Sequence, residues 1–134
     1  MTRHRTIDPE GLGEIPGSHH IVVAQGSTHV YLSGQTPTGP DGTIIGAGDL
    51  AEQTRVTFEN VKTCLTAAGA SPDDVVRTMI YIVDWSPEML EPFFTGALAA
   101  WGEQLPSAAT TMLGVQSLFY PGQLIEVDVT AVLD

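Results

Sequence analysis

The stretch Val75–Val83 constrains the fold of this chain more than any other, because most of its positions are apolar. In an extended conformation its larger side chains would alternate between two faces, with Val76, Ile80 and Ile82 on one and Val75, Met79, Tyr81 and Val83 on the other. A strand that is apolar on both faces has to be covered on both. The rest of the chain provides only two helices, and a helical crossover between parallel strands places both on the same side. We therefore expect a second copy of the chain to cover the other face, in an obligate homo-oligomer.

Both helices are predicted by apolar residues that recur at helical spacing. The first follows Asp49, a residue typical of a helix N-cap, and ends at Gly69, a residue typical of a helix C-terminus. The second begins at about Pro87 or Pro92 and runs to Trp101. Its broad apolar stripe predicts burial in the core, above all for the aromatic residues Phe93, Phe94 and Trp101.

Six segments read as strands: residues 19–23, 29–33, 43–45, 75–83, 109–115 and 124–132. The first two flank a short turn, Gln25-Gly26-Ser27, which predicts a hairpin, and we expect the last two strands to form another hairpin. Residues 1–18 are polar and rich in Gly and Pro, which predicts a mostly irregular arm. The order β-β-β-α-β-α-β-β indicates a single two-layer α+β domain over residues 1–134, with both helices on one face of a mixed sheet.

The last of these strands carries an unusual run of acids. Ile125, Val127, Val129 and Ala131 fall on one face, and Glu126, Asp128 and Thr130 fall on the other. Residues 78–134 contain seven acidic residues and no Lys or Arg, so no cation close in sequence neutralises Glu126. Taken alone, this pattern is typical of a solvated sheet face, while a cavity beside Glu126 would make it a catalytic candidate.

The charge balance excludes several classes of partner. With 16 acidic residues against 5 Lys and Arg, the formal net charge is −11, which argues against nucleic acids and against anionic membranes.

One cysteine excludes an internal disulfide and suits a reducing compartment, so we expect a cytoplasmic protein. His19 and His20 would point to opposite faces of a strand without a Cys or an acid to complete a set of ligands. We therefore expect no metal and no cofactor.

Four strings in order resemble the reactive intermediate deaminase family (Rid, YjgF-type): VYLSGQTP at 30–37, QT with ENVK at 53–62, AAGAS leading to DVVRT at 67–78, and IEVDVTAV at 125–132. Together they span roughly residues 17–133. The resemblance implies a chorismate-mutase-like fold and a homotrimer with its sites between subunits. Members of the family that hydrolyse imines and enamines, typically 2-aminoacrylate, use a glutamate on the last strand to position or activate water. Glu126 falls on that glutamate, and Ser33 and Gly34 fall on a turn whose backbone carbonyl assists.

Two further family positions differ in this chain. His20, with His19 and Ser18 as alternatives, falls where many members have a tyrosine that helps to close the pocket. Thr110 falls where the family has an arginine that grips the substrate carboxylate, and no Lys or Arg follows Arg77 in the sequence. A threonine hydroxyl cannot replace a bidentate guanidinium. We therefore expect a neutral substrate to be preferred over a carboxylate.

These features predict a Rid-like enzyme that hydrolyses a small imine or enamine, or catalyses a related Glu-assisted proton transfer such as hydration, in specialised metabolism. Glu126 and Thr110 are the predicted catalytic residues, and His20, Ser33 and Gly34 are the predicted substrate-binding residues. The alternative is a non-catalytic small-molecule-binding or regulatory trimer that has lost deaminase activity. A third possibility, ribonuclease activity, conflicts with the net negative charge.

Overall fold

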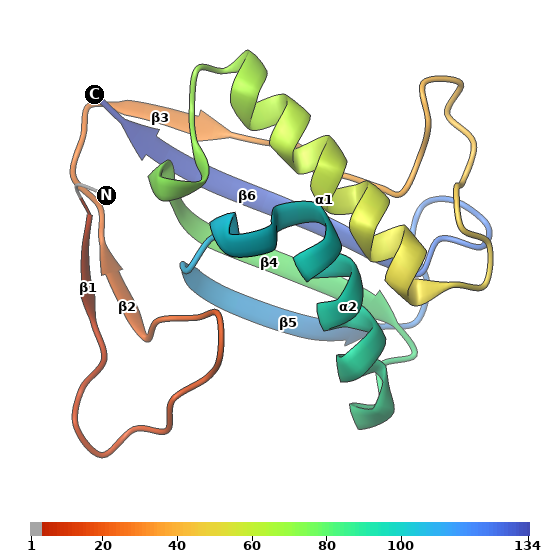
Figure 1. Ribbon diagram of the computed structural model, residues 1–134, viewed down its shortest axis with the longest axis horizontal. Coiled ribbons are helices and arrows are strands. Elements are labelled where there is room, and N and C mark those ends of the chain that lie inside the picture. Colours follow the sequence, from red (N-terminus) through yellow and green to blue (C-terminus); the bar gives the residue numbers. More distant parts are fainter. Residues whose placement is uncertain (1–3) are drawn as a thin grey trace.

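The computed structural model describes residues 4–134 and contains a four-stranded mixed sheet with two helices on one face (Figure 1). This confirms the predicted α+β class and the order β-β-β-α-β-α-β-β. Short 3-10 turns occur at Pro72–Asp74, Pro87–Met89 and Gly102–Gln104. The regular elements are β1 (Arg5–Ile7), β2 (Ile21–Val23), β3 (Thr28–Tyr31), α1 (Leu50–Ala67), β4 (Val75–Val83), α2 (Leu90–Trp101), β5 (Ala109–Val115) and β6 (Ile125–Leu133).

The strands of the main sheet lie in the order β3-β6-β4-β5. β4 pairs in parallel with β5 and antiparallel with β6, and β6 pairs antiparallel with β3. The prediction of a final hairpin is therefore wrong, because β4 separates the last two strands. The crossover through α2 places β5 on one edge of β4, and the long connection over residues 116–124 carries the chain past β4 to its other edge.

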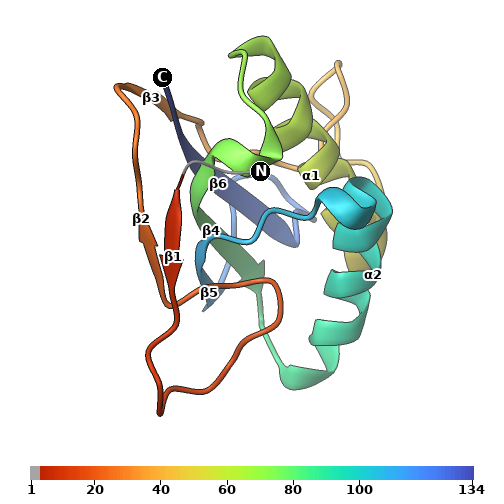
Figure 2. The same cartoon turned by 60° about the vertical axis from the view of Figure 1, so that its left-hand side comes forward.

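The predicted N-terminal hairpin is also wrong. β2 pairs with β1, while β3 pairs with β6 in the main sheet. The arm predicted to be mostly irregular thus contributes a strand of its own, and the β1–β2 ribbon lies beyond the sheet on the side away from the helices (Figure 2). Residues 43–45, predicted to be a strand, form only an isolated bridge between Thr38 and Ile44.

Both helices have the predicted ends. The Asp49 carboxylate accepts the Glu52 backbone N–H at 3.1 Å, which caps the first turn of α1. Gly69 has a φ of +76° just beyond the last turn of α1, where a side chain would be strained. α2 begins at Leu90, between the two proline positions considered, after a 3-10 turn at Pro87–Met89.

The core lies between the helices and the inner face of the sheet. Phe58 of α1 packs edge-to-face against Phe93 and Trp101 of α2, with ring centroids 6.1 and 5.9 Å apart. Val75 belongs to this core, and its predicted place on the opposite face is wrong. A β-bulge between Val75 and Arg77 shifts the register there and turns the Val75 side chain inward.

The other face of the sheet is only partly covered within one chain. Tyr31 on β3 is 73% exposed and Leu113 on β5 is 43% exposed. The odd-numbered residues of β4 from Met79 to Val83 lie on this face, beside Glu126 and Asp128 of β6. Apolar side chains therefore share the open face with carboxylates.

Candidate functional site

Glu126 lies on β6, on the face of the sheet that points away from the helices. Its neighbours Ile125 and Val127 are buried against the core, which fixes the orientation of the Glu126 side chain. Gln123 donates from Nε2 to Glu126 Oε1 at 3.2 Å, and the same amide nitrogen donates to the Ile125 carbonyl at 3.0 Å. Gln123 is itself buried, so the carboxylate is held by a fixed neutral donor.

The turn that follows β3 reaches the second carboxylate oxygen. A methyl group in place of the Gly34 hydrogen would lie 2.8 Å from Glu126 Cδ and closer still to Oε2. Only glycine permits this approach. Two backbone hydrogen bonds between Gln35 and Val127, at 2.7 and 3.0 Å, hold the turn against β6. The Ser33 carbonyl accepts the Gln35 side-chain amide at 3.0 Å, so the structure places Ser33, Gly34 and Glu126 in one neighbourhood.

Tyr81 and Asp128 extend this neighbourhood along the same face. Tyr81 is the cross-strand partner of Glu126, and its hydroxyl donates to Asp128 Oδ2 at 3.2 Å. Burial raises the pKa of Tyr81, and the nearby Asp128 carboxylate raises it further, so the phenol stays protonated and remains a donor at neutral pH. The sequence placed Asp128 on the same strand face as Glu126, but it did not indicate Tyr81 or Gln123. Tyr81 depends on the register between β4 and β6, and Gln123 depends on the direction of its side chain.

Thr110 lies elsewhere. It is paired with Thr78 of β4 on the face that meets the helices, and its hydroxyl donates to the Ala108 carbonyl at 3.1 Å. Thr78 also pairs with Val129 of β6, which lies three residues after Glu126 and therefore points to the opposite face. Within one chain, Thr110 and Glu126 therefore face opposite sides of the sheet.

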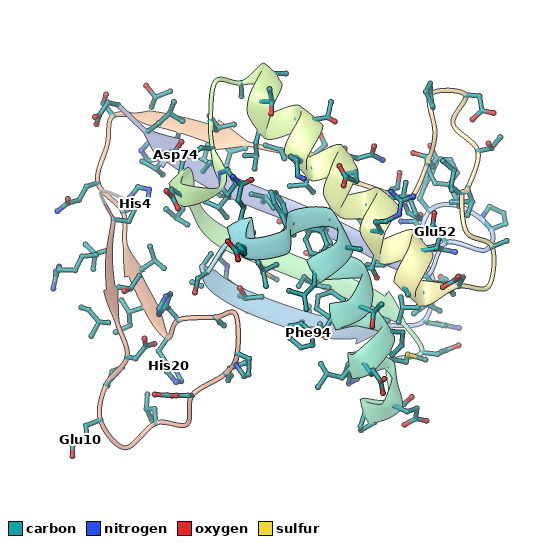
Figure 3. All side chains as sticks on the ribbon, in the orientation of Figure 1. His4, Glu10, His20, Glu52, Asp74 and Phe94 are labelled. Atoms are coloured by element: carbon teal, nitrogen blue, oxygen red, sulfur yellow. The ribbon has the colours of Figure 1, made fainter. Side chains whose placement is uncertain are left out.

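The three candidates for the tyrosine position lie beside Thr110. Ser18 forms a parallel bridge with Ala108, and the His19 N–H donates to the Ala108 carbonyl at 3.0 Å. The His20 ring is 2.7 Å from the Gly13 carbonyl through Nε2, in the arm (Figure 3). Ser18, His19 and His20 line, with Thr110, a cavity of about 200 Å³ at the edge of β5. The structure thus brings His20 close to Thr110 and not to Glu126.

Arg77 lies near Thr110, and the sequence did not predict a cation there. It is the cross-strand partner of Ala109 and lines the same cavity. Its Nη2 donates to Thr111 Oγ1 at 3.1 Å, on the face opposite to Thr110. Arg77 therefore adds a positive charge near the cavity without restoring a guanidinium at position 110.

The predicted site residues thus form two sets. We call Ser33, Gly34 and Glu126, together with Gln123, which was not predicted, the Glu126 group. Ser18, His19, His20 and Thr110 are the Thr110 group. The Glu126 group offers a carboxylate that can accept or donate a proton, and the Thr110 group offers hydroxyl and imidazole hydrogen bonds. Asp8 orients His19 through a 2.8 Å ion pair, and hydrogen bonds from the His20 backbone N–H and the His19 ring lower the pKa of Asp8.

Residues 4–134 offer neither a metal-binding cluster nor a membrane-spanning helix. No cluster of three or more His, Cys, Asp or Glu side chains that could hold a metal ion occurs in this part of the chain. None of the helices described is long and apolar enough to cross a membrane.

With this geometry established, comparison with known proteins identifies the family. Residues 18–133 match the family model described as Endoribonuclease L-PSP, and the chain therefore belongs to this family, which is the Rid or YjgF family. The solved structure of YyfB from Yersinia pestis, a Rid-family protein described as of unknown function, is 34% identical. The superposition covers 98% of this chain and 100% of the YyfB chain, with a TM-score of 0.89.

Two sequence relatives come from the same family. The 3-aminoacrylate deaminase RutC of Acinetobacter baylyi is 29% identical over 120 residues, which are 89% of this chain and 90% of RutC. A RutC family protein of Pyrococcus abyssi is 42% identical over 55 residues. That match covers 41% of this chain and 43% of the relative, so the chain spans less than half of that protein's length.

Proposed function

We propose that the protein is a Rid-family enzyme that hydrolyses the carbon–nitrogen bond of a small uncharged imine or enamine, with Glu126 as the general acid and base. The observation that carries the proposal is the carboxylate held by Gln123 on one oxygen and approached by Gly34 at the other. A carboxylate fixed in this way can exchange a proton with a water molecule beside it. Relationship to RutC, a 3-aminoacrylate deaminase, supports the same class of reaction.

The proposed reaction consumes one water and releases ammonia. The water oxygen attacks the imine carbon while its proton passes to Glu126, and the π electrons move to the nitrogen. Glu126 then gives that proton to the nitrogen, which completes a carbinolamine. Glu126 next takes the proton of the carbinolamine hydroxyl and passes it to the nitrogen, so that the oxygen electrons form the carbonyl as the carbon–nitrogen bond breaks. The products are a carbonyl compound and ammonia, and an enamine enters the same path after it tautomerises to the imine. A hydration that stops at the addition step would use the same groups.

The Thr110 group supports an uncharged substrate. A carboxylate buried beside Thr110 without its cation would lose roughly 2–5 kcal/mol of binding. Arg77 lines the same small cavity, but its guanidinium donates to Thr111 and does not take the place of a guanidinium at position 110. A neutral substrate needs only hydrogen bonds from Thr110 and His20, which the Thr110 group can provide.

We further propose a cytoplasmic homotrimer in which the Glu126 group of one subunit meets the Thr110 group of the next. The opposite orientation of the two groups within one chain supports this arrangement, because one chain alone cannot surround a small substrate with both. The exposed Tyr31 and Leu113 on the open face of the sheet support burial of that face against other copies.

The alternative function is a small-molecule-binding or regulatory trimer without turnover. Threonine at position 110, where the family resemblance predicts an arginine, favours this alternative. A protein that has lost deaminase activity would no longer need a cation that binds the substrate carboxylate. The ribonuclease activity in the description of the family model has less support here. The open face carries Glu126 and Asp128, which repel phosphates, and the chain has only 5 Lys and Arg in total.

The decisive experiment measures ammonia release by the purified protein from a panel of imines generated in place, matched in size and differing in charge. We expect turnover of neutral imines, weaker turnover of carboxylate imines and no turnover by Glu126→Ala. Binding of a panel member that survives in Glu126→Ala, with no turnover of any member by the wild type, would establish the binding protein instead.

A further inference from the structure

An apolar cavity of about 300 Å³ lies between α2 and the inner face of the sheet. Exposed Ile15 of the arm and exposed Leu90 of α2 mark its open side, and Phe94 lines it from α2 (Figure 3). The deeper lining consists of aromatic and aliphatic side chains from both layers, among them Phe58, Val61, Ile80, Phe93, Ala97 and Met112.

The size of the cavity is unusual for a core. An engineered apolar cavity of roughly 150 Å³ stays dry and binds benzene, and the present one is about twice as large. Protein interiors are otherwise packed without such voids, because atoms that line an empty space lose dispersion contacts. A ligand of matching shape would restore those contacts, so the cavity has the properties of a binding site.

Two polar groups belong to the lining. The indole N–H of Trp101 is buried without an acceptor in residues 4–134. Buried polar groups are normally hydrogen-bonded. Thr78 is 7% exposed and contributes a hydroxyl to the lining. An oxygen or nitrogen on a ligand can therefore pair with the Thr78 hydroxyl.

The lining also defines the charge of the ligand. None of its residues is Asp, Glu, Lys, Arg or His. An ionised group would lose its hydration there without gaining a counter-charge, which excludes carboxylates and ammonium groups from the deep part of the cavity.

We propose that this cavity binds an uncharged aromatic or alicyclic group of up to two fused rings that carries one hydrogen-bonding atom for Thr78. Thr110 lines both this cavity and the smaller one beside His20. The proposal rests on the proposed function in one respect, because it assigns the apolar part of the substrate to this cavity.

The test uses the full-length protein and isothermal titration with three probes of one shape: 2-naphthol, naphthalene and 2-naphthoate. Binding of 2-naphthol is expected, with 2-naphthoate at least about tenfold weaker. Ala97 is buried in the lining, whereas its neighbour Leu98 is 52% exposed on the other side of α2. Ala97→Phe should weaken 2-naphthol at least tenfold because the new ring occupies the cavity, and Leu98→Phe should not. Equal binding by Ala97→Phe and the wild type would overturn the site.

A second variant keeps the test decisive if Ala97→Phe does not fold. Thr78→Val preserves shape and removes the hydroxyl, so 2-naphthol should bind about 2- to 10-fold more weakly while naphthalene is unchanged. Equal losses for both probes would overturn the role of Thr78, and 2-naphthoate binding as tightly as 2-naphthol would overturn the uncharged ligand. Glu126→Gln separates the two proposals. It should bind 2-naphthol as tightly as the wild type does, because Glu126 does not line the cavity. If the wild type binds 2-naphthol but turns over no imine, the result contradicts the proposed function and not the cavity.

Discussion

The Glu126 group and the Thr110 group lie on opposite faces of one sheet and differ in every property that matters for chemistry. Glu126 lies on the open face beside Asp128 and Tyr81, with a neutral amide as its donor. Thr110 lies over the core, where it lines an apolar cavity without charged side chains, and it also lines the smaller cavity beside Arg77. The comparison separates two kinds of chemistry: the first group offers a carboxylate, and the second offers hydroxyl and imidazole hydrogen bonds.

The difference follows from the positions of the two groups in the sheet. A carboxylate between the helices and the sheet would lack a counter-charge, whereas on the open face it keeps part of its hydration. An apolar cavity on the open face would be exposed to water, whereas between α2 and β5 much of its lining is buried in the core. Each group therefore occupies the face that suits its chemistry, and a site that uses both needs contributions from two chains.

The largest effect is expected from removing the proposed proton carrier, Glu126. Glu126→Gln keeps the shape and the hydrogen bond with Gln123 but cannot exchange a proton, so turnover of a neutral imine should fall about 100- to 10,000-fold. Ammonia release under saturating substrate measures this. Asp128→Asn is the matched control, because it removes a carboxylate from the same face without touching Glu126. Equal losses in both variants would mean that the charge of the face, and not Glu126, determines turnover.

The second prediction changes the substrate preference through the Thr110 group. Thr110→Arg introduces the guanidinium that the family resemblance predicts at this position, so the preference between a carboxylate imine and its neutral analogue should shift about 10- to 100-fold toward the carboxylate. The ratio of kcat/KM values for the two substrates measures the shift, and Thr110→Val should leave the ratio near that of the wild type. An unchanged ratio in Thr110→Arg would place the substrate away from position 110.

Much of the fold could be predicted from the sequence because its signals are local. Asp49 and Gly69 mark the ends of α1 through hydrogen bonds and backbone angles that involve only neighbouring residues. The pairing of strands is not local, and both predicted hairpins were wrong for that reason. The bulge at Val75 has the same origin, since a register shift depends on the partner strand.

Part of the candidate site could be predicted from the sequence. The resemblance placed Glu126, Gly34 and Thr110 at family positions, and the structure brings Gly34 against Glu126. It could not reveal that Gln123 holds the carboxylate or that Arg77 lies beside Ala109, because both depend on register and side-chain direction. The cavity behind Thr110 was hidden as well, because a stripe such as Phe93 and Phe94 predicts a core whether or not that core is filled.

The third prediction concerns the contact on which the Glu126 group depends. Gly34→Ala places a methyl group against the Glu126 carboxylate, which must move away from Gln123. Because the nearest atoms belong to the end of one flexible side chain, the free energy of unfolding should fall by no more than about 1 kcal/mol, while turnover should fall as the carboxylate is displaced. Denaturant titration measures the first effect. Gly13→Ala is the control, because nothing lies within 4 Å of the added carbon, and a similar loss there would show that the substitution acts on the backbone alone.

The smallest effect tests the environment of the open face by pH. Burial and the Asp128 carboxylate raise the pKa of Tyr81 above its ordinary value of 10.0, so the unfolded chain releases this proton before the folded one does. Its contribution to stability is therefore complete below pH 10 and is lost as the pH rises toward the pKa of the folded state. Tyr81→Phe should lower stability at neutral pH by no more than about 1 kcal/mol and should flatten the alkaline loss. Denaturant titrations below and above pH 10 measure the slope. Tyr31→Phe, at a position 73% exposed, should keep the wild-type slope, and an unchanged slope in Tyr81→Phe would mean that the carboxylates of the open face do not act on this phenol.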